Sequence, residues 1–283
     1  MKGKISYIWS IAFAMIIIGC IPDDLPVGKI PQLKSKIVVS SHITSDQSLV
    51  IFLTKSVGAL DASDDSDIQE LIDQITINDA LVIVSGNNVS DTLELIDQGL
   101  YATASLPLTV GETYHLLVQS PTMGSVTSET VVKGQVVFES LEGNIYDTGY
   151  DTLAELRYSF QDPVGRNFYM VNVQRITRDY EPEDFLNPRI FTSLLHDSHF
   201  DQQLHTEDLK VFGGRDFMPG DTLGVFLSNI SEDYHDFIEV RLDSRYNFAD
   251  FLGEPANYPT NVQGGLGFFN LYIPDVRILT LGE

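Results

Sequence analysis

The residues best suited to metal chemistry are histidines and aspartates that crowd into one short segment. The segment contains His196, Asp197, His199, Asp201 and His205. Imidazole nitrogens and carboxylate oxygens are common ligands of transition metals. His196 and His199 would share a face only on a helix, which the neighbouring Asp, Ser and Gln residues do not favour, and no His-Glu-x-x-His core is present. We therefore predict a polar surface loop and assign no metal ligand, although metal binding by His196, His199 and His205 stays open.

A second candidate for metal binding is an acidic stretch near the start of the chain. It contains Asp61, Asp64, Asp65 and Asp67. Counted from Asp61, an EF-hand loop would need glycine at position six and glutamate at position twelve, where this chain has Ser66 and Ile72. We predict a solvated loop and no cofactor, and metal binding by the Asp61–Asp67 loop stays open.

The motifs of common enzyme classes do not occur in the sequence. Gly265 and Gly267 suggest a phosphate loop, but Asn270 stands where Gly-x-Gly-x-x-Gly needs its third glycine, and no helical pattern follows. There is no Gly-x-Ser-x-Gly elbow. Scattered carboxylates cannot be assigned as glycosidase acids without their separation in space. We predict that the protein is not an enzyme and name no catalytic residue.

Cys20 is the only cysteine, so the chain can form no internal disulfide. It ends a segment with a positive start at Lys2 and Lys4, an apolar run over residues 5–18, and Gly19. A run of about fourteen apolar residues is too short to span a bilayer comfortably. The segment resembles the signal peptide and lipobox of bacterial lipoproteins, in which the cysteine thiol is diacylated with fatty acids such as palmitate.

The lipoprotein resemblance implies a cellular address. Residues 1–19 would be a removed signal peptide, Cys20 the lipidated first residue, and residues 20–35 a tether. Two acyl chains give stable attachment to a membrane. Asp23 and Asp24 are similar to the export signal that sends lipoproteins of the Bacteroidota to the outer face of the outer membrane. We therefore expect a lipid-anchored outer-membrane protein that faces the cell exterior.

The charge balance excludes some partners. The chain has 40 acidic and 17 basic residues and a net charge of −23, and loss of Lys2 and Lys4 with the leader would make it −25. Nucleic acid is an unsuitable partner because phosphate binding needs a basic face. Direct binding to anionic lipid is disfavoured for the same reason.

The pattern of the first half predicts an antiparallel β-sandwich over residues 36–133. β-branched and apolar runs recur every eight to twelve residues, with glycine turns between them. The spacing of Gly99 and Tyr101, followed by Gly111 and Tyr114, is similar to transthyretin-like modules of surface proteins. We predict an immunoglobulin-like or transthyretin-like sandwich, a fold that implies no chemistry by itself.

The second half, residues 134–283, is predicted to be a further β-rich domain with one amphipathic helix near residues 231–245. Ser231 is a suitable N-cap, and the acidic residues after it suit the helix dipole. Tyr234, Phe237, Ile238 and Leu242 recur at helical spacing. This aromatic stripe predicts a helix that packs on the sheet.

The whole chain after the leader resembles the Bacteroidota lipoprotein family known as domain of unknown function 4249. The resemblance rests on the order and spacing of several short motifs: the lipobox, the Gly99–Tyr114 module, Phe160 to Pro163, Gly165, Asn167 to Tyr169, Asp197, Phe200-Asp201, Gly220 to Thr222, the Tyr234 helix, Pro255 to Asn257, Asn261-Val262, Gly264-Gly265 and Gly267-Phe268. Members often have Asn-Gly after the Phe200 position, where this chain has Asp201-Gln202.

The family resemblance implies a function that does not involve catalysis. Its members are expected to be outer-membrane lipoproteins commonly encoded beside TonB-dependent transporters, with no catalytic residues assigned. We expect a non-enzymatic surface lipoprotein that is accessory to a TonB-dependent β-barrel transporter, in substrate capture or complex assembly. The alternative is a stand-alone glycan-binding surface lipoprotein.

Overall fold

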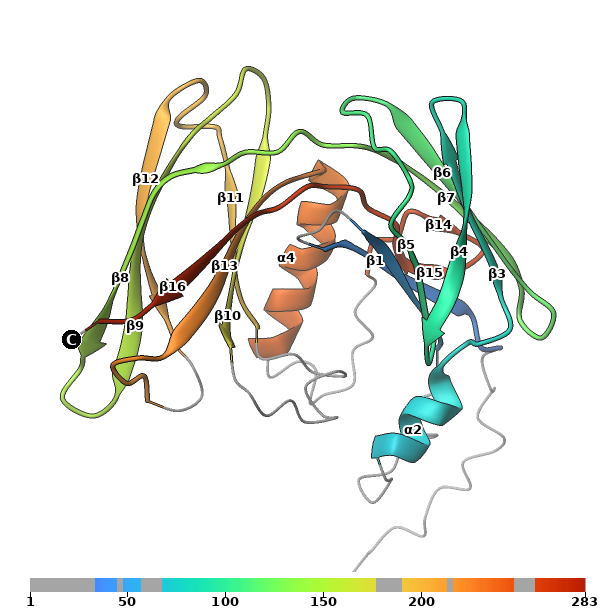
Figure 1. Ribbon diagram of the computed structural model, residues 1–283, viewed down its shortest axis with the longest axis horizontal. Coiled ribbons are helices and arrows are strands. Elements are labelled where there is room, and N and C mark those ends of the chain that lie inside the picture. The colour runs from blue at the N-terminus through green and yellow to red at the C-terminus, as the bar shows by residue number, and fades with distance from the viewer. Residues whose placement is uncertain are drawn as a thin grey trace, which may run out of the picture. The chain divides into compact units, whose positions relative to one another are not determined.

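Strands with alternating buried and exposed residues build most of the chain, as the sequence predicts. The computed structural model describes residues 34–44, 48–56, 68–176, 190–212, 216–246 and 258–282. Ser35–Glu283 form one compact unit. The protein is mostly β, with two helices among the described residues (Figure 1). None of the helices in these ranges is long and apolar enough to cross a membrane.

The largest sheet has nine strands, most of them from the first half of the chain. They are β1 (Ile37–Ile43), β2 (Leu49–Lys55), β3 (Leu81–Gly86), β4 (Val89–Asp97), β5 (Leu100–Thr103), β6 (Thr113–Ser120), β7 (Gly124–Val131), β14 (Val262–Gln263) and β15 (Leu266–Phe268). Their order is β14-β7-β6-β3-β4-β5-β2-β1-β15. Seven of these strands come from residues before 134, whereas β14 and β15 come from the second half of the chain.

Local turns and a strand that changes partner shape the nine-stranded sheet. Asn87 and Asn88 adopt positive φ between β3 and β4, as a tight two-residue hairpin turn requires. β4 first pairs with β3 and then, after Leu93, with β5. A strand that switches partners in this way lets one continuous sheet fold over on itself.

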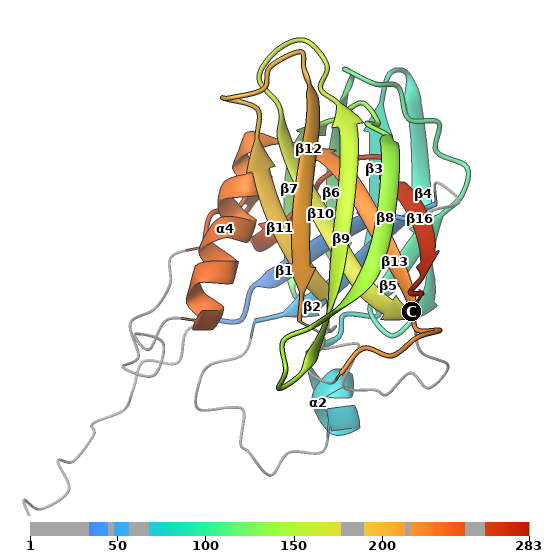
Figure 2. The same ribbon diagram turned by 90° about the vertical axis from the view of Figure 1, so that its left-hand side faces the viewer.

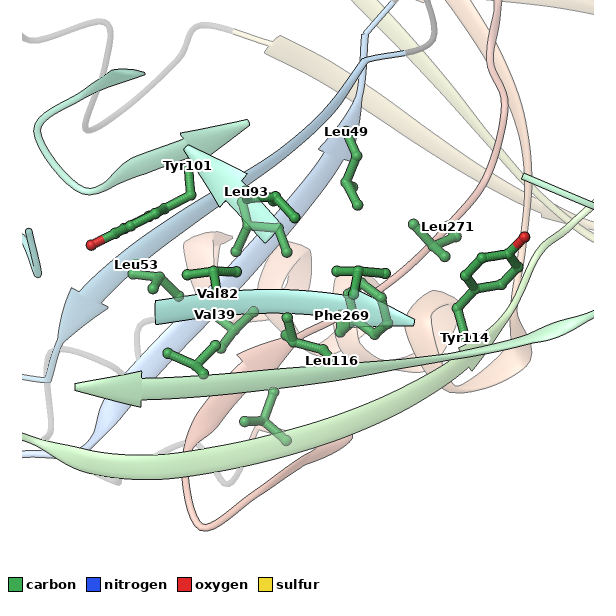
Figure 3. Close-up of a cluster of buried hydrophobic side chains, with 14 of the residues drawn as sticks. Val39, Leu49, Leu53, Val82, Leu93, Tyr101, Tyr114, Leu116, Phe269 and Leu271 are labelled. Carbon is green, nitrogen blue, oxygen red and sulfur yellow. The ribbon is translucent and has the colours of Figure 1, made fainter. Parts of the chain in front are cut away.

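The core of this sheet lies on the inner side of its fold. Side chains such as Val39, Leu53, Val82 and Leu116 point toward one another from different strands, and Phe269 joins them from the last part of the chain (Figure 3). Each of these side chains is almost fully buried. The period of two along the strands thus places one side of each strand in the core.

The second half of the chain contributes two smaller sheets. The strands are β8 (Phe138–Asp147), β9 (Thr152–Gln161), β10 (Phe168–Ile176), β11 (Ile190–His196), β12 (Leu204–Val211), β13 (Thr222–Ile230) and β16 (Asp275–Thr280). They are ordered β12-β9-β8 and β11-β10-β13-β16 (Figure 2). Leu156, Tyr158, Val171 and Val225 belong to one hydrophobic cluster that draws on both sheets, so the two sheets pack face to face.

Helix α4 (Glu232–Tyr246) occupies the predicted position after β13. Its first turn is capped as expected, because the Tyr234 backbone N–H donates to the Ser231 hydroxyl at 3.3 Å. Tyr234 and Ile238 pack with Met170 of β10 and with Phe268 of β15. The helix therefore contacts both the four-stranded sheet and the end of the nine-stranded sheet.

Helix α2 (Ile68–Ile75) is a feature that the sequence reading missed. Because the residues before it are acidic, the sequence predicted a loop in this part of the chain. Ile68, Leu71, Ile72 and Ile75 have the spacing of one helical face, and Ile72 is buried. The helix has only about two turns, and its start directly follows the acidic stretch that was predicted to be a loop.

Candidate functional site

Two of the residue sets singled out from the sequence lie outside the described residues. These are Cys20 with the leader around it, and the acidic Asp61–Asp67 loop. Lipidation of Cys20 and a solvated Asp61–Asp67 loop stay predictions, and metal binding by that loop stays open.

The histidines of the 196–205 segment point to different partners. His196 and His199 are exposed, and their ring centroids are 6.5 Å apart. His205, on β12, stacks on Phe200 at 4.0 Å and has its Nε2 2.9 Å from a carboxylate oxygen of Glu207. The three rings therefore do not converge on one point in the part of the chain that the structure describes.

A buried polar network, missed by the sequence reading, joins the motifs that carry the family resemblance. Asp162 accepts hydrogen bonds from the Tyr169 hydroxyl and from the Gln202 backbone N–H. Asp197 accepts from the Asn167 backbone N–H at 2.6 Å. Burial, and then the hydrogen bond to Asp162, raise the pKa of Tyr169, so its hydroxyl stays protonated and donates.

This network already has protein partners for its buried carboxylates. Asp162, Asp197 and Asp201 have oxygens within 4.8 Å of one another, a spacing that a cation could bridge. Asp162 has both oxygens bonded within the protein. We interpret the cluster as a hydrogen-bond network that holds together the end of β9, the start of β10 and the turn after β11.

A cavity of about 680 Å³ lies among the described strands and helix α4. Ligand pockets in proteins commonly have volumes of about 300–1,000 Å³. The residues that line it come from the outer faces of two sheets and from helix α4. Each of these three elements contributes a different kind of surface.

The first wall is the face of β1, β2 and β5 that points away from the core. Alternation buries Val39, Ser41 and Ile43 in the core direction and turns Ser40 and His42 outward. The outward residues that line the cavity are Val38, Ser40, His42, Phe52, Thr54 and Leu100. Adjacent strands bring them side by side, since Ser40 pairs with Phe52.

The second wall is the outer face of β10, β11 and β13. Tyr169, Val171 and Val173 of β10 point into the sandwich core. The alternate residues face the cavity, namely Met170, Asn172 and Gln174, together with Ile190, Thr192, Phe226 and Ser228 from the neighbouring strands. The Thr192 hydroxyl donates to the Asn172 side-chain oxygen at 2.9 Å, which fixes the amide and leaves its N–H groups for another acceptor.

Helix α4 supplies aromatic surface and a charge. Tyr234, Phe237, Ile238, Arg241 and Leu242 line the cavity from this helix. The Tyr234 and Tyr272 hydroxyls are hydrogen-bonded to each other, and burial raises the pKa of both phenols. These rings therefore stay neutral and rigidly packed.

His42 and Arg241 define the electrostatics of the cavity. Both are exposed, but the His42 ring opens into the cavity and is surrounded by protein on most sides. Burial first, and then the positive charge of Arg241, lower the pKa of His42 below its usual value of 6.5. At neutral pH, Arg241 is therefore the cationic side chain of the described lining.

The cavity has one arrangement that resembles part of a catalytic site. Ser40 Oγ and His42 Nε2 are 3.4 Å apart, which is long for a hydrogen bond. A nucleophilic serine needs a well-oriented histidine, usually held by a carboxylate. None of the described lining residues carries a carboxylate. The arrangement suits binding better than acyl transfer.

The sequence alone did not reveal this cavity, because each wall resembles an ordinary solvent-facing strand side. Ser40 with His42, and Asn172 with Gln174, alternate with buried apolar residues as surface positions do. A signal was available, since several outward positions carry large apolar residues such as Phe226 of β13. These residues indicate that the faces are covered.

Comparison with known proteins gives one strong match. The model of a family described as "Domain of unknown function (DUF4249)" matches residues 26–275. No curated protein matches the sequence. A solved structure of a two fibronectin type-III domain segment from chicken tenascin aligns over 87% of this chain and 99% of its own, with 11% identity and a TM-score of 0.23. That likeness is too low to carry an argument.

Proposed function

The chain belongs to the DUF4249 family, and we propose that it is a non-enzymatic, cell-surface lipoprotein that captures a small ligand for an outer-membrane TonB-dependent transporter. In this proposal Cys20 anchors the protein in the outer membrane, and the cavity between the two sheet faces holds the ligand. The single observation that carries the proposal is that cavity, with its volume of about 680 Å³.

The lining supports binding of a small molecule. Apolar and aromatic walls supply most of the buried area that a ligand needs, and a few polar groups fix its orientation. Here the walls come from residues such as Phe52, Met170 and Phe268, and the polar groups from residues such as Asn172 and Gln174. No side chain among the described residues forms a hydrogen bond with the Gln174 amide, which is therefore available to a ligand.

The transporter part of the proposal is tested on the native membrane. The protein is cross-linked through its abundant carboxylates in intact outer membranes, purified, and its partners are identified by mass spectrometry. We expect a β-barrel transporter in stoichiometric amount. Recovery of the lipidated protein alone would count against an accessory role and would favour the alternative, a stand-alone glycan-binding lipoprotein.

The ligand-capture part is tested by filling the cavity. Ser40→Trp places a large ring on the first wall, and Ser125→Trp is the matched control on the exposed face of β7. We expect native mass spectrometry to find a small molecule on the wild type and on Ser125→Trp but not on Ser40→Trp. An equal load on all three proteins would place the ligand elsewhere and overturn the proposed site.

A further inference from the structure

The lining of the cavity differs in charge from the rest of the protein. Of the 283 residues, 40 are aspartate or glutamate. The described residues that line the cavity include none of them. A ligand that carried a positive charge would find no counter-ion on these walls, and a buried unpaired charge is costly. The cavity therefore disfavours cations.

Arg241 gives the described lining of the cavity its positive charge. Among the described residues, no carboxylate lies within ion-pair distance of its guanidinium. His42 faces the same space and is neutral at pH 7, because its pKa is lowered. A guanidinium presents a planar fork of donors that matches carboxylate and other oxyanions.

The charged and apolar residues of the lining differ in exposure. Arg241 and His42 are exposed, whereas Met170, Ile238 and Phe268 are buried. Arg241 is therefore accessible to solvent, while the buried apolar residues can contact the body of a ligand. A ligand that fits both would have a charged end and an apolar body.

We propose that the ligand is an amphiphilic organic acid, with an aromatic or aliphatic body inside the cavity and one oxyanion head paired with Arg241. The inference rests on the proposed ligand-capture function and names the class of ligand. The neutral amides of Asn172 and Gln174 on the second wall donate further hydrogen bonds to polar atoms along the body.

The test compares two probes that differ in charge. The full lipidated chain, held in nanodiscs of zwitterionic phosphatidylcholine, is titrated into the millimolar range with 4-phenylbutyrate and with 4-phenylbutan-1-ol. Binding is followed by ligand-observed NMR, with empty nanodiscs as the blank. We expect the acid to bind about tenfold more tightly than the alcohol, the difference that one charge-assisted hydrogen-bonded pair supplies.

Arg241 is tested with a matched control. We expect Arg241→Gln to abolish the preference for the acid and Arg241→Lys to keep part of it. Arg157→Gln removes an exposed arginine on β9, away from the cavity, and should keep the full preference. Equal affinity for the two probes in the wild type, or a preference that survives Arg241→Gln, would overturn the inference.

Further experiments distinguish a failure of this inference from a failure of the proposed function. Octanoate in place of 4-phenylbutyrate distinguishes an aliphatic from an aromatic body. Ser40→Trp, and Gln174→Trp on the opposite wall, should remove binding of both probes while the circular dichroism spectrum stays unchanged. The ligand-capture function itself fails if neither probe binds to the wild type. It also fails if both probes bind to a folded filled-cavity variant as tightly as to the wild type. Binding that is sensitive to Ser40→Trp but shows no preference for the acid defeats only the present inference.

Discussion

Single polar residues decide how the described β-strands are joined at their ends. Asn167 is the clearest case, because its buried side chain bonds to three other parts of the chain. Its amide donates to the carbonyls of Pro163 and Gly165, and its oxygen accepts from the Asn229 amide at 3.2 Å. The residue therefore holds the loop before β10 against β13.

Replacing Asn167 should destabilise the protein. Asn167→Ala leaves two loop carbonyls and the buried Asn229 amide without these partners, so we expect the free energy of unfolding to fall by about 1–3 kcal/mol. Asn144→Ala, at an exposed position of β8, is the control and should change it by less than about 0.5 kcal/mol. Urea denaturation measures both, and equal effects would show that the network is not stabilising.

His42 should make stability depend on pH. Its folded-state pKa is lowered, mainly by burial and then by Arg241, so the unfolded chain binds a proton more readily than the folded one. Stability is complete above the unfolded pKa of about 6.5 and falls as the pH drops toward the lower folded pKa.

The pH effect is measured as the change in the free energy of unfolding per pH unit, from neutral pH down to pH values below 6.5. His42→Gln should flatten the slope. Asn144→Gln, at an exposed position of β8 and without a titratable group, should leave it as in the wild type. A slope that His42→Gln does not change would mean that the ring titrates equally in both states.

At the scale of elements, the pairing of β1 with β15 depends on a glycine. Gly267 has φ of +88°, and a Cβ at this position would lie 2.0 Å from the Val39 carbonyl oxygen. The two strands run parallel, with Val39 opposite Gly267. No larger residue fits, so the Gly-rich stretch that resembles a phosphate loop has a packing role in the structure.

Gly267→Ala should therefore weaken this pairing. Gly111→Ala is the matched control, since Gly111 has φ of +85° but nothing within 4 Å of a new Cβ. The control should lose about 1–2 kcal/mol from backbone strain alone. We expect Gly267→Ala to lose a further 1–3 kcal/mol or so from the clash. Similar losses in the two variants, measured by chemical denaturation, would contradict the close approach.

At the scale of the whole molecule, attachment to the membrane is predicted to depend on Cys20. Cys20→Ser removes the thiol that would be acylated, so the protein should move from the membrane to the soluble fraction and lose the mass of the lipid. Gly28→Ala, in the predicted tether, should stay in the membrane fraction. Fractionation with mass spectrometry checks both, and membrane attachment of Cys20→Ser would refute the lipid anchor.

The sequence determined the features that depend on neighbours along the chain. Recurring β-branched and apolar runs predicted a mostly β protein, and Ser231 with Tyr234 and Ile238 predicted a capped helix that packs on a sheet; both are present. The short motifs also identified the family. Local steric preferences and hydrophobic periodicity are properties of adjacent residues, so they can be read without a structure.

Only the tertiary structure decided which distant residues meet. Asp162 and Gln202 are forty positions apart, and His42 and Arg241 almost two hundred, yet each pair is brought together. The cavity arises because the outer faces of two sheets and the helix border one space, whereas each face by itself reads as a solvent-exposed surface. Such contacts depend on how whole elements pack, and no short-range pattern in one sequence encodes that choice.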